Sequence, residues 1–140
     1  MQYSFKKLNL IVGWLSFVLA STVYLLTMEP TASFWDCSEF IATSYKLEVG
    51  HPPGAPLFMM ISRFFTMFGG PGQAAVLVNS MSALASGATV MFLFWTITHQ
   101  ARPAMRKSGD ELTLPQTIAV LGAGLIGAGA YTFTDTFWFS

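Results

Sequence analysis

The stretch LNLIVGWLSFVLASTVYLLTM, residues 8–28, carries no charge and is rich in leucine, valine and aromatic side chains. A helix needs about 20 such residues to cross the hydrocarbon core of a bilayer. The stretch therefore predicts a first transmembrane helix. Lys6 and Lys7 precede it, as in a signal peptide. However, the apolar run exceeds the ~7–15 residues usual for a signal peptide, and no clear A-x-A cleavage site follows.

The composition of the whole chain agrees with a membrane protein. Of its 140 residues, 53% are hydrophobic and 10% are charged, whereas soluble domains carry about 25% charged residues. The formal net charge is zero, and no long basic cluster occurs. These features exclude a nucleic-acid-binding protein.

Two further spans are predicted after the first. Residues 64–98 are uncharged, but Gly69-Gly70-Pro71-Gly72 interrupts them, so the second span is expected at about 73–98. The third is expected at about 114–133, where GAGLIGAGA would pack closely against neighbouring helices. Small residues recur there at intervals of four, in the stripes Ala119, Ala123, Gly127 and Gly124, Ala128. The predicted fold class is an all-α membrane protein with three transmembrane helices.

The positions of lysine and arginine predict the orientation. Lys6 and Lys7 precede the first span, and Arg102, Arg106 and Lys107 follow the second. Both flanks should therefore be cytoplasmic, with the loop 29–72 on the outer side. We expect an integral protein of a bacterial inner membrane, in which this loop lies in the periplasm.

The outer loop is expected to form two interfacial helices, at 34–49 and 56–68. Ser33 can cap the first, Gly50 suits its left-handed end, and Pro52 and Pro53 prevent its continuation. Asp36, Glu39, Thr43 and Lys46 then share an arc of about 80°. Pro56 fits the first position of the second helix, which is too short to span.

Several ionisable residues of the outer side are candidate site residues, each with a simpler explanation. Asp36 has the spacing of a capping box with Ser33, Glu39 can be a solvated acid, and His51 can be a turn residue. Arg63 can snorkel to the headgroups. Asp135, at the outer end of the third span, can be an interfacial cap. Their convergence on one outward surface favours a functional site, since charge at membrane level is costly.

The motifs FWDCSEF and GHPPGAPLF, set between two spans, resemble the start of the domain-of-unknown-function-2723 membrane proteins. These are similar to transmembrane-protein-260-like protein O-mannosyltransferases of the GT-C glycosyltransferase superfamily. The resemblance implies a membrane glycosyltransferase that moves a sugar, mannose above all, from a polyprenyl-phosphate donor to a Ser or Thr hydroxyl of a protein. It also implies two juxtamembrane helices after the first span and an acid there acting in catalysis.

On this resemblance, Asp36 is the expected catalytic base and Glu39 would orient Asp36, the acceptor or the sugar. His51 and Arg63 are candidate partners of the departing phosphate, and Lys46 is a weaker one because it lies about 15 Å along the helix from Asp36. Asp135 is a further candidate substrate-binding residue. Some members of the superfamily use a divalent metal. Because the sequence shows no histidine–carboxylate cluster at ligand spacing, we predict no metal and no other cofactor.

Family members have many more spans, so the chain is expected to be the N-terminal part of a larger enzyme and inactive alone. Two alternatives remain open. A transporter or channel subunit would use Asn79, Asp36 and Glu39 to line a polar path. A non-catalytic assembly subunit would instead use the Gly/Ala stripes to bind a partner helix.

Overall fold

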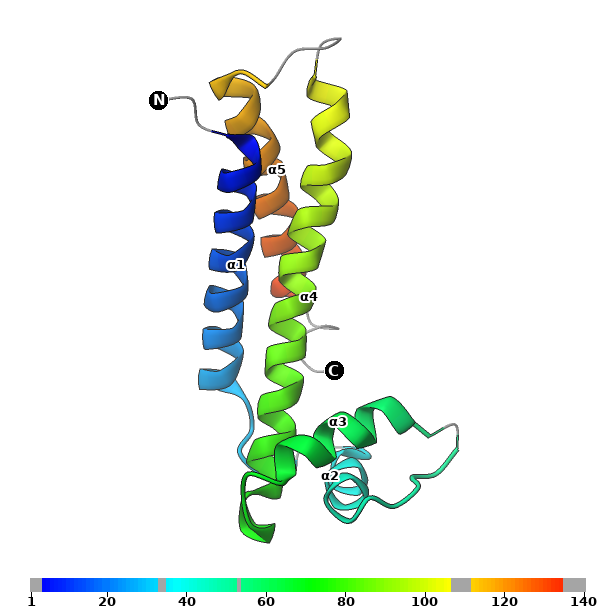
Figure 1. Cartoon of the computed structure of the whole chain (residues 1–140). Coiled ribbons are helices and arrows are strands. Elements are labelled where there is room, and N and C mark those ends of the chain that lie inside the picture. The colour runs from blue at the N-terminus through cyan, green and yellow to red at the C-terminus, as the bar shows by residue number, and fades with distance from the viewer. Residues whose placement is uncertain (1–3, 33–34, 53, 107–111, 135–140) are drawn as a thin grey trace. The chain divides into compact units, whose positions relative to one another are not determined.

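The computed structural model describes residues 4–32, 35–52, 54–106 and 112–134, and every regular element in these ranges is a helix (Figure 1). The elements are α1 (Phe5–Thr27), α2 (Cys37–Lys46), α3 (Pro56–Thr66), the 3-10 turn η1 (Pro71–Gln73), α4 (Ala74–Met105) and α5 (Leu114–Thr132). The predicted all-α class is confirmed.

Three helical segments in the described part of the chain are long and apolar enough to cross a bilayer, namely Phe5–Thr27, Pro71–Met105 and Leu114–Thr132. The second is longer than the predicted 73–98, since α4 continues through Arg102 and Pro103. A charged residue ends the segment that suits hydrocarbon, but it does not end the helix, which can continue into water.

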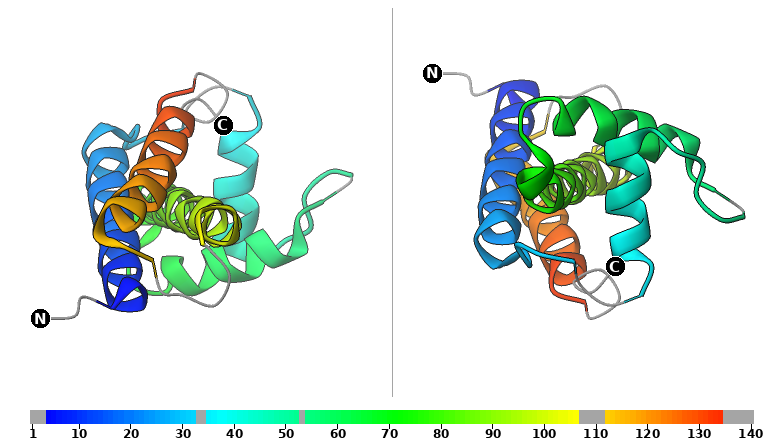
Figure 2. Two further views of the ribbon diagram at one scale, coloured as in Figure 1. Left: turned by 90° about the horizontal axis from the view of Figure 1, so that it is seen from above. Right: turned by 90° about the horizontal axis from the view of Figure 1, so that it is seen from below.

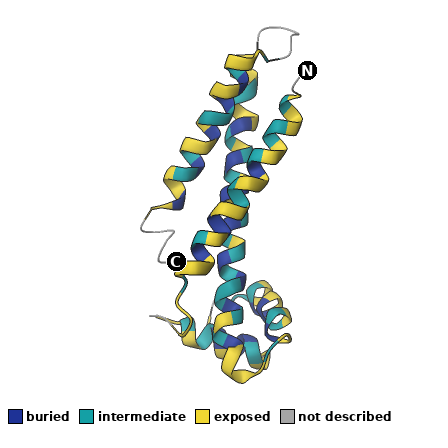
Figure 3. Ribbon diagram, turned by 90° about the vertical axis from the view of Figure 1, so that its left-hand side faces the viewer, coloured by how far each residue is buried: buried dark blue, intermediate teal, exposed yellow. Residues whose placement is uncertain are grey.

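The chain forms two compact units, Met1–Val23 with Ser86–Ser140, and Tyr24–Ala85. In the first unit, α5 packs closely on α4 at Gly124, where a Cβ atom would lie 2.6 Å from Cγ2 of Thr98 and 2.8 Å from the Phe94 ring. Each long helix carries both buried and exposed positions (Figure 3). In α5, Gly124 and Ala128 are buried, whereas Ala119 and Ala123 are exposed. The predicted stripe Gly124, Ala128 thus packs within the chain. In the other stripe, Ala119 and Ala123 do not.

In the second unit, α2 and α3 lie side by side (Figure 2). The rings of Phe40 and Phe58 meet edge to face, with centroids 5.4 Å apart. The hydroxyls of Thr43 and Ser44 lie 3.2 and 3.3 Å from the sulfur of Met59. Thr43 is therefore buried against α3, although it belongs to the same predicted arc of α2 as Glu39 and Lys46.

Helix α2 is shorter than the predicted 34–49. Of the predicted start, Ser33 and Phe34 lie outside the described residues, and α2 begins at Cys37. It ends in a Schellman motif, in which Glu48 N–H donates to Thr43 O and Leu47 N–H to Ser44 O. The left-handed residue is Leu47, at φ 58°. The prediction that Gly50 ends the helix is wrong.

Helix α3 begins at Pro56 as predicted and ends at Thr66, two residues before the predicted 68. Its exposed face is apolar, with side chains spaced three or four residues apart, and the stripe continues just beyond the helix. These residues are Leu57, Met60, Ile61, Phe64, Met67 and Phe68. Such a stripe is typical of a helix that lies at a membrane interface.

Candidate active site

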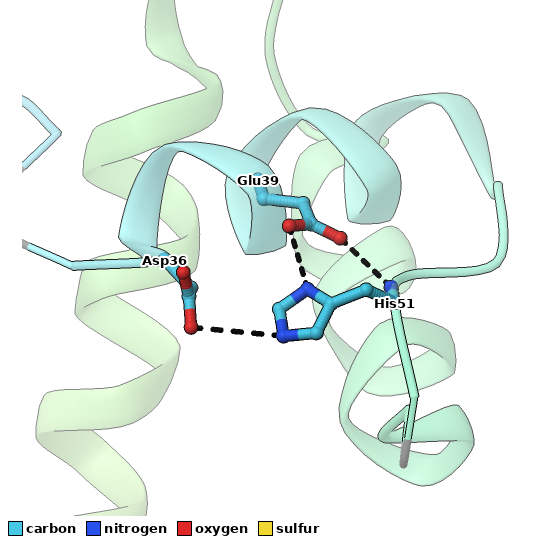
Figure 4. A group of neighbouring side chains, drawn as sticks. All are labelled: Asp36, Glu39 and His51. Carbon is cyan, nitrogen blue, oxygen red and sulfur yellow. Dashed lines mark hydrogen bonds and ion pairs between the residues drawn. The ribbon is translucent and has the colours of Figure 1, made fainter.

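Asp36, Glu39 and His51 come together in the second unit (Figure 4). Glu39 lies in the first turn of α2, Asp36 directly precedes this helix, and His51 belongs to the loop between α2 and α3. The spacing of three residues places both carboxylates on one side of the helix. The loop then returns the histidine to that side.

Glu39 holds His51 through both of its carboxylate oxygens. The backbone N–H of His51 donates to Oε1 at 2.8 Å, and Nδ1 lies 2.7 Å from Oε2. Two bonds from one carboxylate fix the position of the backbone and the direction of the ring. In this arrangement Nδ1 carries a proton, and Nε2 faces away from Glu39.

Asp36 lies at the other ring nitrogen of His51. Its Oδ2 is 3.7 Å from Nε2, and its side chain is 61% exposed. Asp36 occupies the N-cap position of α2 but makes no capping hydrogen bond with its side chain. The carboxylate is therefore not held by the helix and is accessible to a substrate.

Gly50 allows the loop to approach Glu39. A Cβ atom at this position would lie 3.1 Å from Cε of Met59 and 3.5 Å from Oε1 of Glu39. A side chain at residue 50 would crowd the space through which His51 N–H reaches the carboxylate. Sequence reasoning assigned Gly50 to the helix end, and its role at the site was missed.

The two ionisable partners shift each other's pKa. The pKa of Glu39 is lowered from 4.5, first by the backbone hydrogen bond from His51 and then by the bond from its side chain. The pKa of His51 is raised from 6.5, first by the side-chain hydrogen bond to Glu39 and then by the charge of that carboxylate. Both shifts favour an imidazolium–carboxylate ion pair.

The other candidate cations have different partners. Arg63 donates from Nη1 to the carbonyl oxygen of Tyr45 and lies over the Tyr45 ring, 5.5 Å from its centroid. It thereby neutralises the C-terminal end of α2 and joins this helix to α3. Lys46 lies 3.9 Å from Glu48, with both side chains largely exposed. The structure brings neither cation to Asp36.

Asp135 lies outside the described residues, so its proposed place in the site stays a prediction. Asn79 has a role that sequence reasoning did not foresee. Its amide donates to the carbonyl oxygens of Glu29 and Thr31, at 2.8 and 3.0 Å, and Cys37 Sγ lies 3.9 Å from its Oδ1. The sequence signal for this role was a polar side chain in the second turn of a predicted span, where it can bind the backbone of a neighbouring loop.

The three site residues could also serve as metal ligands. Each offers one ligand atom, and these atoms lie within 4.8 Å of one another. The sequence shows no histidine–carboxylate cluster at ligand spacing, but the loop brings together in space three residues that are separate in sequence. Carboxylate oxygen and imidazole nitrogen are ordinary ligands of zinc and manganese. The predicted absence of a metal stays a prediction.

A family model described as the protein O-mannosyl-transferase TMEM260 N-terminal domain matches residues 36–140. The chain belongs to this family. The matched region begins at Asp36 and contains Glu39 and His51, together with the second and third candidate spans. With three such helices, we regard the chain as part of an integral membrane protein of this family.

Two curated relatives carry the same family name. The chain is 26% identical to protein O-mannosyl-transferase TMEM260 of Mus musculus over 122 residues, which cover 87% of this chain and 15% of that protein. It is 27% identical to the tmem260 protein of Dictyostelium discoideum over 94 residues, covering 66% and 12% of the two chains. The chain thus spans about one seventh of the length of these relatives. No solved structure matches it.

Proposed function

We propose that the chain supplies the acceptor side of the active site of a membrane mannosyltransferase. The whole protein would move a mannosyl group from a polyprenyl-phosphate donor to a Ser or Thr hydroxyl of a protein. The names of the relatives support the reaction class. The observation that carries the assignment is the convergence of Asp36, Glu39 and His51 within the region that the family model matches.

Asp36 is the proposed general base. The acceptor hydroxyl oxygen attacks the anomeric carbon, and Asp36 takes the hydroxyl proton as the new C–O bond forms. The bond from the anomeric carbon to the phosphate oxygen breaks, and the phosphate leaves with the electron pair. The Asp36 carboxylate is exposed and makes no capping hydrogen bond, so the acceptor hydroxyl can approach it.

Glu39 and His51 act as positioning residues in this proposal. Glu39 fixes the imidazole, whose Nε2 lies 3.7 Å from Asp36. In a single inverting displacement, the base and the leaving group occupy opposite faces of the sugar. A ring this close to Asp36 belongs on the base side. We therefore assign His51 to the orientation of Asp36, in place of its predicted contact with the phosphate.

The departing phosphate needs cations or hydrogen-bond donors. Arg63 and Lys46 are engaged by Tyr45 and Glu48, as described above. We assign the phosphate contacts to other parts of the whole protein, since this chain covers 15% of the mouse relative. This division of the site agrees with the expectation that the chain is inactive alone.

The proposed position of the site is the headgroup level on the outer face, the periplasmic face in a bacterial inner membrane. The apolar stripe of α3 supports an interfacial position of the loop. A donor anchored by a polyprenyl chain presents its phosphate and sugar at this level. Enzyme and donor would then meet without the sugar entering hydrocarbon.

The two alternatives receive less support. Asn79 donates to backbone carbonyl oxygens, which explains a polar residue in α4 without a transport path. Gly124 and Ala128 are used within the chain, so they do not require a partner helix. Ala119 and Ala123 are exposed, and they would be the remaining surface for an assembly subunit.

Asp36→Asn in the whole protein tests the proposal. Membranes containing the variant are supplied with polyprenyl-phosphate mannose and an acceptor peptide, and mannosyl transfer is measured. Loss of a general base should reduce the rate by about 100-fold or more. Ser38→Ala, at an exposed position of the same helix turn, is the matched control and should keep wild-type transfer. Wild-type turnover by Asp36→Asn at equal membrane abundance would refute the proposal.

A further inference from the structure

A groove of about 560 Å³ lies in the first unit, between the N-terminal end of α1 and the C-terminal half of α4. Its lining includes Lys6 and Asn9 from α1, and Trp95, His99, Gln100 and Arg102 from α4. None of these residues belongs to the candidate active site.

The lining changes from polar to apolar along α4, and on α1 both Phe5 and Lys6 line the end of the helix. On α1, Lys6 lies at the end of the helix, and Leu10 lies one turn closer to its middle. On α4, Arg102 lies near the helix end, and Phe92 lies about 15 Å closer to its middle. Leu10 and Phe92 are 53% and 59% exposed. This gradient fits an amphiphile with a polar head and an acyl chain, and it does not fit a small soluble ion.

The charge at the polar end is positive. Lys6 and Arg102 line the groove, and no aspartate or glutamate of the described residues does so. The Arg102 guanidinium lies over the Phe5 ring, 5.0 Å from its centroid, which restricts its orientation. Its Nε is buried and forms no hydrogen bond with any described group. A buried donor without a partner is costly and is expected to find an acceptor.

The walls of the groove are held by contacts within the unit. The indole N–H of Trp95 donates to the carbonyl oxygen of Asn9 at 3.1 Å. Gly13 permits this approach, since a Cβ atom there would lie 2.1 Å from Nε1 of Trp95. The groove therefore exists before a ligand arrives, which lowers the entropic cost of binding.

We propose that this groove binds the headgroup of an anionic phospholipid, with the phosphate at Lys6 and Arg102 and an acyl chain along Leu10 and Phe92. Phosphate oxygens would accept hydrogen bonds from guanidinium and ammonium groups, as they do at other arginine sites. A lipid satisfies the charge and the apolar part of the lining together. The site is independent of the chemistry at Asp36.

Native mass spectrometry of the whole protein tests this site. The protein is released from detergent in the presence of phosphatidylglycerol or phosphatidylcholine, and retained lipid is counted. The test variant is Lys6→Gln with Arg102→Gln. The control is Lys7→Gln with Arg106→Gln, which removes the same charge at exposed positions that do not line the groove.

The wild type should retain phosphatidylglycerol in preference to phosphatidylcholine. Each cation near a membrane surface contributes about fivefold in affinity, so the test variant should lose about 30-fold and the control far less. If the test variant does not fold, Lys6→Gln alone should still lose about fivefold, because its side chain is exposed. Three results would overturn the proposal. Equal loss of lipid in both double variants would show an effect of general surface charge. No loss in either double variant would show that another segment covers the groove, and displacement of the lipid by inorganic phosphate alone would show a site for a soluble ligand.

Discussion

Glu39 accepts two hydrogen bonds from His51, one from the backbone N–H at 2.8 Å and one from Nδ1 at 2.7 Å. The carboxylate thus ties the loop after α2 back to the first turn of that helix. Both partners are substantially exposed, so their ion pair depends on pH and not on burial. The position of His51 beside Asp36 follows from this bond pattern.

The ion pair should give the loop a defined pH range of stability. Since the pKa of His51 is raised above 6.5, the contribution of His51 to the stability of the loop is complete below pH 6.5 and is lost as pH rises through the raised pKa. Since the pKa of Glu39 is lowered below 4.5, the contribution of Glu39 to the stability of the loop is present above pH 4.5 and is lost as pH falls through the lowered pKa. The loop should be held most firmly between about pH 4.5 and 6.5.

NMR titration of 13C-labelled histidine in the whole protein measures this effect, with His51→Gln used to assign the signal. The apparent pKa should lie above 6.5 in the wild type and fall toward 6.5 in Glu39→Gln. Glu48→Gln, whose carboxylate pairs with Lys46, should leave the pKa unchanged. An unchanged pKa in Glu39→Gln would show that the pair does not form.

A side chain at residue 50 should disturb the site. In Gly50→Ala the new Cβ lies 3.1 Å from Cε of Met59, which can move, so we expect a loss of about 1 kcal/mol in the free energy of unfolding. Gly50→Val should lose more and should also reduce mannosyl transfer, because Glu39 is displaced. Gly72→Ala, where a Cβ would meet nothing within 4 Å, is the matched control. Thermal melts that do not separate the three variants would contradict this role.

Arg63 should act through the fold and not through the donor phosphate. Arg63→Gln removes the hydrogen bond to Tyr45 O and the stacking on the Tyr45 ring, at a cost of about 2 kcal/mol in unfolding free energy. Lys46→Gln, an exposed control, should cost about 0.5 kcal/mol or less. Thermal melts are compared with KM for the polyprenyl-phosphate donor. A raised donor KM at unchanged stability would instead make Arg63 a phosphate ligand.

Metal removal should leave the reaction unaffected. In the proposed mechanism Asp36 accepts a proton directly, and Glu39 is occupied by His51. Transfer is measured after dialysis against a chelator and again after addition of manganese or zinc. We expect equal rates before dialysis, after dialysis and after addition of manganese. Loss of activity on chelation and recovery with manganese would make Asp36, Glu39 and His51 a catalytic metal site.

The sequence alone determined the membrane helices, because the length of an uncharged apolar run is set by bilayer thickness and needs no tertiary contact. It also placed the Asp36 and Glu39 carboxylates together, since two acids three residues apart on one helix share a side whatever the helix packs against. Pro56 likewise marked the start of α3, because proline is favoured in the first turn of a helix.

Only the tertiary structure decided which cations join those acids. His51 reaches Glu39 because Leu47 takes the left-handed position and leaves Gly50 to pass close to the carboxylate. Arg63 is an equally plausible partner of these acids in the sequence, but its guanidinium donates a hydrogen bond to the carbonyl oxygen of Tyr45 at the end of α2. Loop paths and helix pairings depend on contacts between residues distant in sequence, such as Met59 with Thr43 and Ser44, and helical periodicity does not encode them.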